Sequence, residues 1–394
     1  MGEVVIVEAV RSAVGKRNGA LSKLHAAELL GDVQAALVQR TGIDPAAVGH
    51  VIGGCVGQVG MQASNVTRQA WLGAGLPLEV PSVTVNTQCG SSQEAVTLGH
   101  AMVASGLADL VVACGVESMS QVPMGANTPT EPDYGHPRAG RYAEIYEPTT
   151  QFEGGDRIVE TWGLTREELD VFGKRSQDLA AAAWNEGRFD GQIVPINAPV
   201  VDDDGNVIGT KVFDRDEGLR ATTLEALAKL KVNQPNRQPA SYHTAGTSSQ
   251  ISDGAGALLL TTPERAEALG LRPRARIVAS VLVGSDPVHM LTGPIPATRA
   301  LLERTGLTLD DIDIVEINEA FASVVLAWQK ELQPDPDRVN VNGGAIALGH
   351  PLGATGSILV TKAVHELERR QGRYALITMC CGGGLGTGTI IERV

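Results

Sequence analysis

The sequence has few aromatic residues, no long apolar run and no excess of positive charge. Phe, Trp and Tyr make up 4% of the 394 residues, and 45 acidic side chains outnumber 32 basic ones, giving a net charge of −13. Such an acidic chain argues against a nucleic-acid-binding surface and against general attraction to anionic membranes. No apolar run approaches the roughly 20 residues that a membrane-spanning helix needs. We therefore expect neither a nucleic-acid partner nor membrane insertion.

Cysteine is also scarce. The five cysteines are odd in number, and none has the C-x-x-C spacing typical of zinc sites. The N-terminal segment MGEVVIVEAV lacks the basic residues of a signal peptide and is predicted to be the first strand. We expect reduced thiols, a cytoplasmic location and no bound metal. The cysteines are Cys55, Cys89, Cys114, Cys380 and Cys381.

Glycine, by contrast, is abundant, and its 46 residues gather where predicted strands pass into predicted helices. Strands and helices alternate up to residue 120 and again from about 245, which predicts parallel pairing in a layered α/β fold. The chain is too long for one ordinary core, and the two stretches repeat the same order of elements. We predict two similar α/β halves, residues 1–120 (completed by about 245–270) and residues 271–394.

Residues 121–244 differ in character and are predicted to form an inserted loop domain that covers the active site. Pro, Asp, Gly and Tyr recur between residues 123 and 148, which predicts a long excursion away from the sheet. Residues 164–188 predict an amphipathic helix with Thr165 as its N-cap. Residues 220–230 predict a second, short helix.

The stretch NVNGGAIALGHPLGATG, residues 340–356, is a candidate site. Gly343, Gly344 and Gly349 permit close backbone approach and positive φ angles. Pro351 favours a defined, non-helical pose for His350, and histidine is the side chain best suited to moving a proton near neutral pH. A glycine-rich turn with an accidentally exposed histidine would give the same pattern, so His350 needs partners before a function can be inferred.

Two cysteines occupy corresponding places in the two halves. Cys89 follows a predicted strand and precedes a predicted helix at residues 91–104. The helix N-terminus should lower its pKa, and the backbone N–H groups there should hold an oxyanion. Cys380 ends the last predicted strand before three glycines, whereas Cys381 should face the other way and be structural. Each cysteine alone could be an inert core residue, but together with His350 they predict one shared site.

With these residues in place, the chain resembles the thiolases, acyl-CoA C-acyltransferases of the 3-ketoacyl-CoA type, over essentially its whole length. The resemblance implies the thiolase fold, with two stacked α/β halves and an inserted loop domain, and a homodimer or homotetramer. The motifs that carry it are Arg11…Gly15-Lys16, Asn86…Cys89-Gly90-Ser91, Glu117-Ser118-Met119-Ser120, Asn318-Glu319-Ala320-Phe321, Gly343…Gly349-His350-Pro351 and Cys380-Cys381-Gly382-Gly383-Gly384.

The resemblance also implies roles for the site residues. Cys89 would be the nucleophile that becomes acylated, and His350 would take its proton. Cys380 would be the second acid/base, exchanging a proton with the CoA thiol or with the α-carbon of an acyl-CoA. Asn318 would hold a water that forms one oxyanion hole with His350. The backbone N–H groups of Cys89 and Gly382 would form the other.

CoA-binding positions follow in the same way. Ser249 matches the pantetheine-contacting serine of the family, and Ala320 and Phe321 should line the pantetheine channel. Arg220 matches an arginine near the adenine nucleotide of CoA, although a solvated surface arginine would explain it equally well. The resemblance thus implies CoA as a co-substrate and no permanently bound cofactor.

The reaction that the resemblance implies is thiolysis in β-oxidation. A 3-ketoacyl-CoA and CoA would give acetyl-CoA and an acyl-CoA shortened by two carbons. The alternatives are a biosynthetic acetoacetyl-CoA thiolase, a β-ketoacyl synthase, and a catalytically silent lipid-CoA carrier on the same scaffold. Asn318 and Cys380 argue against the synthase, and the presence of Cys89, His350 and Cys380 together argues against the carrier.

Two departures from the thiolase pattern matter. Ser92 replaces a usual glycine, a small change that should leave Cys89 usable. Where the family has Met-Gly-x-Thr-Ala-Glu over the acyl pocket, this chain has QFEGGD at residues 151–156, which is closer to thiolases of actinobacterial steroid side-chain breakdown. We expect Gly154 and Gly155 to let this loop stand further from the nucleophile, giving a roomy apolar pocket for long or ring-bearing acyl groups.

Overall fold

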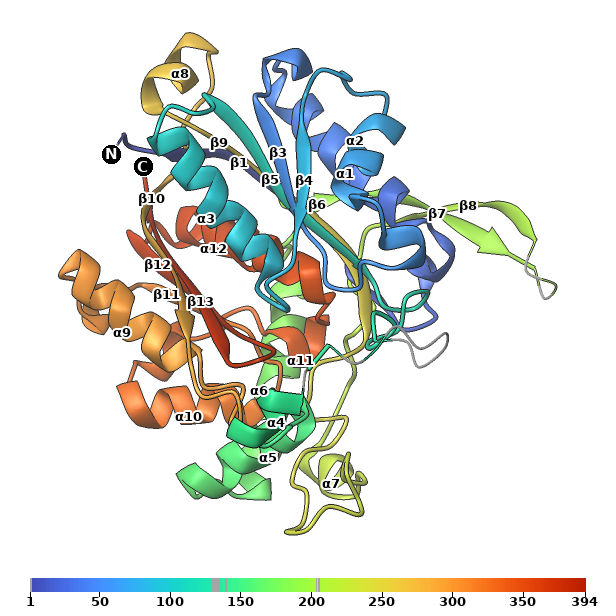
Figure 1. Cartoon of the computed structure of the whole chain (residues 1–394), viewed down its shortest axis with the longest axis vertical. Helices are drawn as coiled ribbons and strands as arrows, with labels where there is room; N and C mark the ends of the chain where they lie inside the picture. Colours follow the sequence, from blue (N-terminus) through green and yellow to red (C-terminus); the bar gives the residue numbers. More distant parts are fainter. Residues whose placement is uncertain (1, 129–134, 136, 139, 203, 205) are drawn as a thin grey trace.

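A computed structural model describes every residue except 1, 129–134, 136, 139, 203 and 205. In this described part, 11 strands form one mixed sheet whose main path runs β11-β12-β13-β10-β1-β9-β5-β3-β4 (Figure 1). The short β2 and β6 pair with β9 and β1. The strands are β1 Val5–Ser12, β2 Gly15–Lys16, β3 His50–Gly54, β4 Ser82–Val85, β5 Leu110–Ser118, β6 Ile193–Val194, β9 Ser252–Thr261, β10 Ala275–Gly284, β11 Ile314–Ile317, β12 Tyr374–Cys381 and β13 Leu385–Arg393.

The sheet has two halves that meet along a short seam. β1 and β10 pair through Val5 with Arg276 and through Ile6 with Ala275. Outward from this seam, the N-terminal half runs β1-β9-β5-β3-β4 and the C-terminal half runs β10-β13-β12-β11. In each half, the strand at the seam is followed by β9 or β13, the last strand of that half in the chain. The strands that come next in the sheet all precede β9 or β13 in the sequence. The predicted pair of similar α/β halves is confirmed.

The predicted parallel pairing is only partly right. Along the main path, β3–β4, β3–β5 and β11–β12 pair in parallel, and the other neighbours pair antiparallel. One of these five antiparallel pairs is the β1–β10 seam, and the other four involve β9 or β13, which were not predicted as strands. Both are rich in glycine, which lowers strand propensity, yet almost every position is buried between neighbouring strands and helices. Just before the candidate stretch 340–356, Val339 forms only an isolated bridge with Val315.

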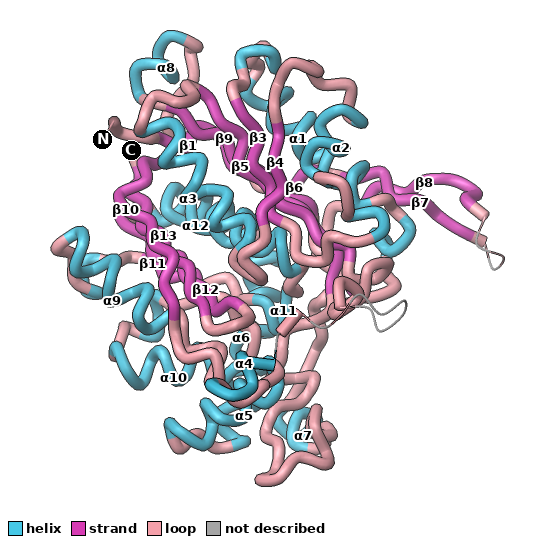
Figure 2. Tube along the Cα trace, in the orientation of Figure 1, coloured by secondary structure: helices cyan, strands magenta, loops and turns pink. Residues whose placement is uncertain are grey.

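Helices separate and cover the two halves of the sheet. α3 and α12 lie between the halves (Figures 1 and 2), and side chains of both helices share one apolar core with strands of both halves. The molecule is therefore layered helix, sheet, helix, sheet, helix. The central helices are α3 Ser91–Ala104 and α12 Thr355–Arg370; α1 Ala26–Thr41 and α2 Val66–Gly73 cover the N-terminal half, α9 Pro294–Thr305 and α10 Ala322–Leu332 cover the C-terminal half, and α8 Pro263–Ala268 links β9 to β10.

A buried ion pair fixes α12 against the C-terminal half. Lys362 Nζ donates to Glu316 Oε2 of β11 at 2.7 Å and to the carbonyl oxygen of Gly343 at 2.8 Å. Both charged side chains are almost completely buried. Gly343 has a φ of +69°, in the left-handed region that favours glycine. The pair thus anchors the glycine turn that leads to His350.

The segment between the halves contains a hairpin that projects from the body and helices that pack on the C-terminal half (Figure 1). The predicted helix at 164–188 is confirmed as α6. Its N-cap is also confirmed, since Thr165 Oγ1 accepts from the backbone N–H of Glu168 at 3.2 Å and Glu168 Oε2 accepts from that of Thr165 at 2.7 Å. The helix predicted at 220–230 is shorter. These elements are β7 Ile196–Val201, β8 Val207–Phe213, α4 Gly140–Ile145, α5 Gln151–Trp162, α6 Arg166–Asn185 and α7 Leu224–Ala228.

Residues 151–156 are helical, so the prediction of a loop there is wrong. They form the first turns of α5, whose N-cap is Thr150. The Thr150 hydroxyl accepts from the backbone N–H of Glu153 at 3.2 Å, and the Glu153 carboxylate accepts from that of Thr150 at 2.8 Å. This reciprocal capping satisfies two N–H groups that would otherwise lack partners. The cap therefore outweighs the low helix propensity of the two glycines that follow it.

Candidate functional site

The loops that follow β4, β11 and β12 border one cavity of about 620 Å³. Cys89 lies between β4 and α3, His350 lies between α11 (Ala345–Leu348) and α12, and Gly382 follows β12 directly. All three line the cavity, so residues from both halves meet there. Much of the remaining wall is apolar and includes Met119, Val122, Met124, Phe152, Met290 and Leu291.

A tight turn presents Cys89 to the cavity. Gln88 has a φ of +51°, which is uncommon for a residue with a side chain. The turn is held by two hydrogen bonds, from Gln88 N to Asn86 Oδ1 at 2.9 Å and from Thr87 N to Ser91 Oγ at 2.9 Å. Cys89 is partly exposed, whereas the other four cysteines are buried. It is therefore the most accessible thiol of the chain.

Burial raises the pKa of the Cys89 thiol to about 11, although hydrogen bonds from the backbone N–H groups of Gly382 and of Cys89 itself oppose the rise. The Glu117 carboxylate adds a smaller upward contribution. The predicted lowering of this pKa is wrong, because desolvation outweighs the helix N-terminus, whose first residue is Ser91. At neutral pH the resting side chain is a protonated thiol, and it needs a base to become a nucleophile.

His350 lines the same cavity and is held by two hydrogen-bonding contacts. Its backbone N–H donates to Ser252 Oγ at 3.1 Å, and its Nδ1 lies 2.6 Å from Thr355 Oγ1. Burial lowers the pKa of His350 to about 4, so the ring is neutral at physiological pH. Gly349 has a φ of +109°, so the predicted need for glycine before this histidine is confirmed.

The two adjacent cysteines at the end of β12 face different surroundings. Cys380 packs with apolar residues that line the cavity, among them Leu291 and Phe321. Burial, followed by the neighbouring Cys89, raises the pKa of the Cys380 thiol well above its usual value. Cys381 belongs to the core between the two sheet halves. The alternation predicted for this strand end is therefore confirmed.

Asn318 lies where β11 ends and is almost completely buried. Its Nδ2 is 3.4 Å from His350 Nε2. Its buried Oδ1 accepts no hydrogen bond from the residues that the structure describes. Buried amide oxygens in polar sites are normally satisfied by protein or water, so this atom is available to an ordered water.

Three of the four predicted CoA-binding residues line the cavity, namely Ser249, Ala320 and Phe321. The backbone N–H of Ser249 donates to the carbonyl oxygen of Ala320 at 2.9 Å, which joins the two segments. Arg220 is exposed and is not part of the wall. Its Nη2 donates to the carbonyl oxygen of Ala245 at 3.4 Å.

Glu117 was not predicted as a functional residue, although it belongs to a quoted motif. Its buried carboxylate lines the cavity and accepts from the backbone N–H groups of Val56 at 2.9 Å, Gly57 at 3.0 Å and Gly353 at 2.8 Å. These bonds tie the turn after His350 to the loop after β3. An acidic residue near the end of an otherwise apolar strand was the sequence signal that could have identified it.

α5 supplies one wall of the cavity through Phe152. The Phe152 and Phe321 rings meet edge to face, with 5.6 Å between centroids. A Cβ on Gly155 would lie 3.3 Å from the Phe321 ring, and one on Gly154 would lie 2.8 Å from the carbonyl oxygen of His289. The two glycines therefore let α5 pack closely against its neighbours. The expectation that they hold this segment further from the nucleophile is wrong.

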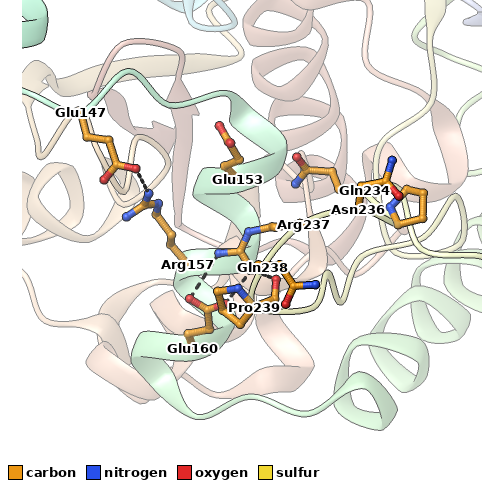
Figure 3. Close-up of a pocket in the computed structure, with 10 residues that line it drawn as sticks. Glu147, Glu153, Arg157, Glu160, Gln234, Asn236, Arg237, Gln238 and Pro239 are labelled. Carbon is orange, nitrogen blue, oxygen red and sulfur yellow. Dashed lines mark hydrogen bonds and ion pairs between the residues drawn. The ribbon is translucent and has the colours of Figure 1, made fainter.

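Another face of α5 borders a separate polar hollow of about 540 Å³ (Figure 3). Arg157 Nη2 donates to Glu147 Oε1 at 2.6 Å, and Arg237 Nη1 donates to Glu160 Oε1 at 2.6 Å. None of the predicted site residues lines this hollow. The ion pair of Arg237 attaches residues 234–239 to α5, and so supports the helix that carries Phe152.

Within the described residues, no group of three or more His, Cys, Asp or Glu side chains is arranged to hold a metal ion. All five cysteines are free thiols. In the same part of the chain, no helix has both the length and the apolar character needed to cross a membrane.

Sequence comparison identifies the family. The family described as "Thiolase, N-terminal domain" matches residues 4–264, and "Thiolase, C-terminal domain" matches residues 271–393. The chain belongs to the thiolase family. It is accordingly an acyltransferase.

Similar proteins cover the chain from end to end. The steroid 3-ketoacyl-CoA thiolase FadA6 of Mycobacterium tuberculosis is 48% identical, over 100% of this chain and 95% of that protein. An acetyl-CoA acetyltransferase of Syntrophomonas wolfei is 39% identical, over 100% and 99%. The crystal structure of the Bacillus anthracis acetyl-CoA acetyltransferase matches with a TM-score of 0.89 at 38% identity, over 100% of this chain and 99% of that one. This structural match confirms the predicted thiolase fold.

A buried histidine outside the cavity gives a testable pH dependence of stability. His365 Nε2 lies 3.0 Å from the carbonyl oxygen of Ala9, and burial, followed by the charge of Arg274, lowers its pKa to about 4. The unfolded chain binds a proton at this position below about pH 6.5, whereas the folded chain does so only near pH 4. Stability from this group is therefore present above pH 6.5 and is lost as the pH falls toward 4, by about 1 kcal/mol per pH unit.

The measurement compares denaturant unfolding of wild type and His365→Gln between pH 7.5 and pH 4.5. We expect His365→Gln to be less stable than the wild type at pH 7.5. Its free energy of unfolding should, however, change less with pH. Titrating groups remote from His365 behave alike in both proteins, so the difference reports on the histidine and on the neighbouring Glu368, whose pKa it influences. If the free energies of unfolding of the two proteins changed equally with pH, a neutral His365 in the folded state would be contradicted.

Proposed function

We propose that this thiolase cleaves a 3-ketoacyl-CoA with CoA, giving acetyl-CoA and an acyl-CoA shortened by two carbons. The observation that carries the proposal is that Cys89, His350 and Ser249 line one cavity, while Cys380 packs against residues of its wall and lies close enough to Cys89 to be affected by its charge. A partly exposed thiol, a neutral imidazole and a second, buried thiol are the groups that a two-step acyl transfer requires.

In the first half-reaction, Cys89 Sγ attacks the 3-keto carbon, and its proton passes to His350 Nε2. The C2–C3 bond breaks, its electron pair stays on C2 of the departing acetyl-CoA, and the Cys380 thiol donates the proton that completes the methyl group. The backbone N–H groups of Cys89 and Gly382 bind the oxygen on the attacked carbon. Asn318, through a water, and His350 bind the oxygen of the acetyl-CoA enolate.

In the second half-reaction, the CoA thiol gives its proton to the Cys380 thiolate and attacks the acyl thioester on Cys89. The Cys89 sulfur leaves and takes back the proton held by His350, which restores all groups. The raised pKa of Cys380 suits an acid that stays protonated until the carbanion forms. No metal or organic group takes part in this sequence, and CoA acts as co-substrate.

The proposal is tested by mass spectrometry after mixing the protein with an acyl-CoA. We expect one acyl adduct, located on Cys89. A catalytically silent carrier would bind the acyl-CoA without forming an adduct. An adduct on another residue, or none, would contradict the proposed nucleophile.

We further infer how the rest of the molecule serves this reaction. The pantetheine arm would run along Ser249, Ala320 and Phe321, which is supported by their position in the cavity wall. Arg220 would meet the adenine nucleotide, but its exposure suits a solvated arginine equally well. We infer a cytoplasmic location, because free thiols are typical of a reducing compartment. We infer a homodimer or homotetramer from the resemblance to the thiolases.

For the acyl group we propose a long or ring-bearing chain, as in β-oxidation of a steroid side chain. The largely apolar wall supports this, and so does the 48% identity to a relative named as a steroid 3-ketoacyl-CoA thiolase. The competing candidate is acetoacetyl-CoA, supported by the 39% identity to a relative named as an acetyl-CoA acetyltransferase. The glycine pair in α5 no longer favours either candidate.

The two candidates predict opposite substrate preferences. We expect kcat/KM for long-chain and steroid-bearing 3-ketoacyl-CoA to exceed that for acetoacetyl-CoA, because each additional buried methylene contributes up to about 0.8 kcal/mol. Phe152→Ala should lower kcat/KM for the ring-bearing substrate and change that for acetoacetyl-CoA little. A preference for acetoacetyl-CoA in the wild type would return the protein to the short-chain class.

A further inference from the structure

His350 has one side-chain partner behind its ring, and that partner is a hydroxyl group. Nδ1 of His350 lies 2.6 Å from Thr355 Oγ1, and the same Oγ1 lies 2.9 Å from the carbonyl oxygen of Pro351. Both His350 and Thr355 are 3% exposed. Among the described residues, no carboxylate hydrogen-bonds the ring, which distinguishes the site from Ser-His-Asp enzymes.

These two distances determine where the protons lie. A hydroxyl has one proton to donate, and the carbonyl oxygen of Pro351 can only accept. If Thr355 donates to Pro351, its lone pair accepts the Nδ1 proton of His350, and both short contacts are hydrogen bonds. If Thr355 instead donated to Nδ1, two oxygens would face each other at 2.9 Å with no proton between them. The first arrangement is therefore favoured, with the proton of the neutral ring on Nδ1.

The other side of the ring agrees with this assignment. Asn318 Nδ2, an N–H donor, lies 3.4 Å from His350 Nε2, so that nitrogen carries a lone pair directed at a donor. Ser252 Oγ accepts from the His350 backbone and so restrains the residue from a third direction. The Thr355 contact thus indicates the tautomer, and the Asn318 contact is compatible with it.

We propose that Thr355 is a positioning residue that holds His350 in the Nδ1–H tautomer and presents the Nε2 lone pair to the Cys89 thiol. The inference rests on the proposed function, because it concerns the proton transfer from Cys89. A hydroxyl fixes the ring without the negative charge that would make it strongly basic. The imidazolium formed during acylation therefore returns its proton readily when the acyl group leaves Cys89.

Two variants and one spectroscopic measurement test the proposal. Thr355→Val keeps the volume but cannot accept the Nδ1 proton, and Thr355→Ser keeps the hydroxyl. We expect Thr355→Val to slow acylation of Cys89 and kcat by roughly 10-fold to 100-fold, less than the 10²- to 10⁴-fold typical of losing a general base outright. KM for CoA should change little. Thr355→Ser should stay within about threefold of the wild type.

The spectroscopic arm does not depend on turnover. In wild-type protein with ¹⁵N-labelled histidine, the His350 ring, assigned with His350→Gln, should show a protonated Nδ1 and an unprotonated Nε2. Protonated Nε2 in the resting protein would overturn the proposal, and so would wild-type acylation by folded Thr355→Val. Absence of any Cys89 adduct in the wild type would instead contradict the proposed function and leave the tautomer result standing.

Discussion

Replacing Cys89 by alanine should lower steady-state thiolysis by at least about 10³-fold and leave no acyl group on the protein, because no other thiol is placed to take over as nucleophile. The other four cysteines are buried, and Cys380, which packs against the cavity wall, has a strongly raised pKa. Cys89 is partly exposed on a turn, so truncation should change the free energy of unfolding by no more than about 1 kcal/mol. The measurements are turnover with a 3-ketoacyl-CoA and intact-protein mass after exposure to an acyl-CoA.

A matched control is Cys114→Ala, which removes a buried thiol of β5 that accepts a hydrogen bond from Gln34 Nε2 at 3.5 Å. It should keep near wild-type turnover while losing some stability. Iodoacetamide should label Cys89 first, because it is the most exposed cysteine and its pKa of about 11 lies below the value of about 12 for Cys114. Residual turnover in Cys89→Ala, or faster labelling elsewhere, would remove Cys89 from the mechanism.

Replacing Cys380 by serine separates the two thiols. Cys89 should still be acylated by a simple acyl-CoA, since CoA thiolate leaves without strong acid assistance. Full thiolysis should fall by about 10²- to 10⁴-fold, because a serine hydroxyl is too weak an acid to protonate the acetyl-CoA carbanion in place of the thiol. The comparison is between the adduct formed in the half-reaction and the steady-state rate.

The neighbouring thiol provides the control for this experiment. Cys381→Ala alters the core between the sheet halves and should lower stability while leaving the ratio of half-reaction to full reaction unchanged. Normal steady-state rates in folded Cys380→Ser would show that another group carries the proton.

Local sequence signals predicted the elements whose ends they mark. α3 spans Ser91–Ala104 as predicted, and the spacing of Thr165 and Glu168 identified the start of α6. The same spacing occurs at Thr150 and Glu153, but the following glycine pair favoured a loop, and that prediction was wrong. β9 and β13 have weak strand propensity and exist because their neighbours bury them, which a local pattern does not reveal.

The chemistry of the site could also be predicted only in part from the sequence. The candidates Cys89, His350 and Cys380 were found from residue type and position at element ends. The direction of the Cys89 pKa shift was predicted wrongly, because it depends on desolvation in the folded cavity. The wall of that cavity comes from segments far apart in the chain, such as α5 and the loop after β10. The partner of His350 is five residues further on, but only the folded turn determines whether the Thr355 hydroxyl faces the ring.

The proposed catalytic groups are divided between the two halves of the sheet. Cys89 comes from the N-terminal half, and His350 and Cys380 come from the C-terminal half, which the N-terminal half meets through the short β1–β10 seam and the shared core around α3 and α12. The proposed proton transfer from Cys89 to His350 therefore crosses from one half to the other. A substitution that loosens the contact between the halves should reduce activity even when both halves keep their own secondary structure.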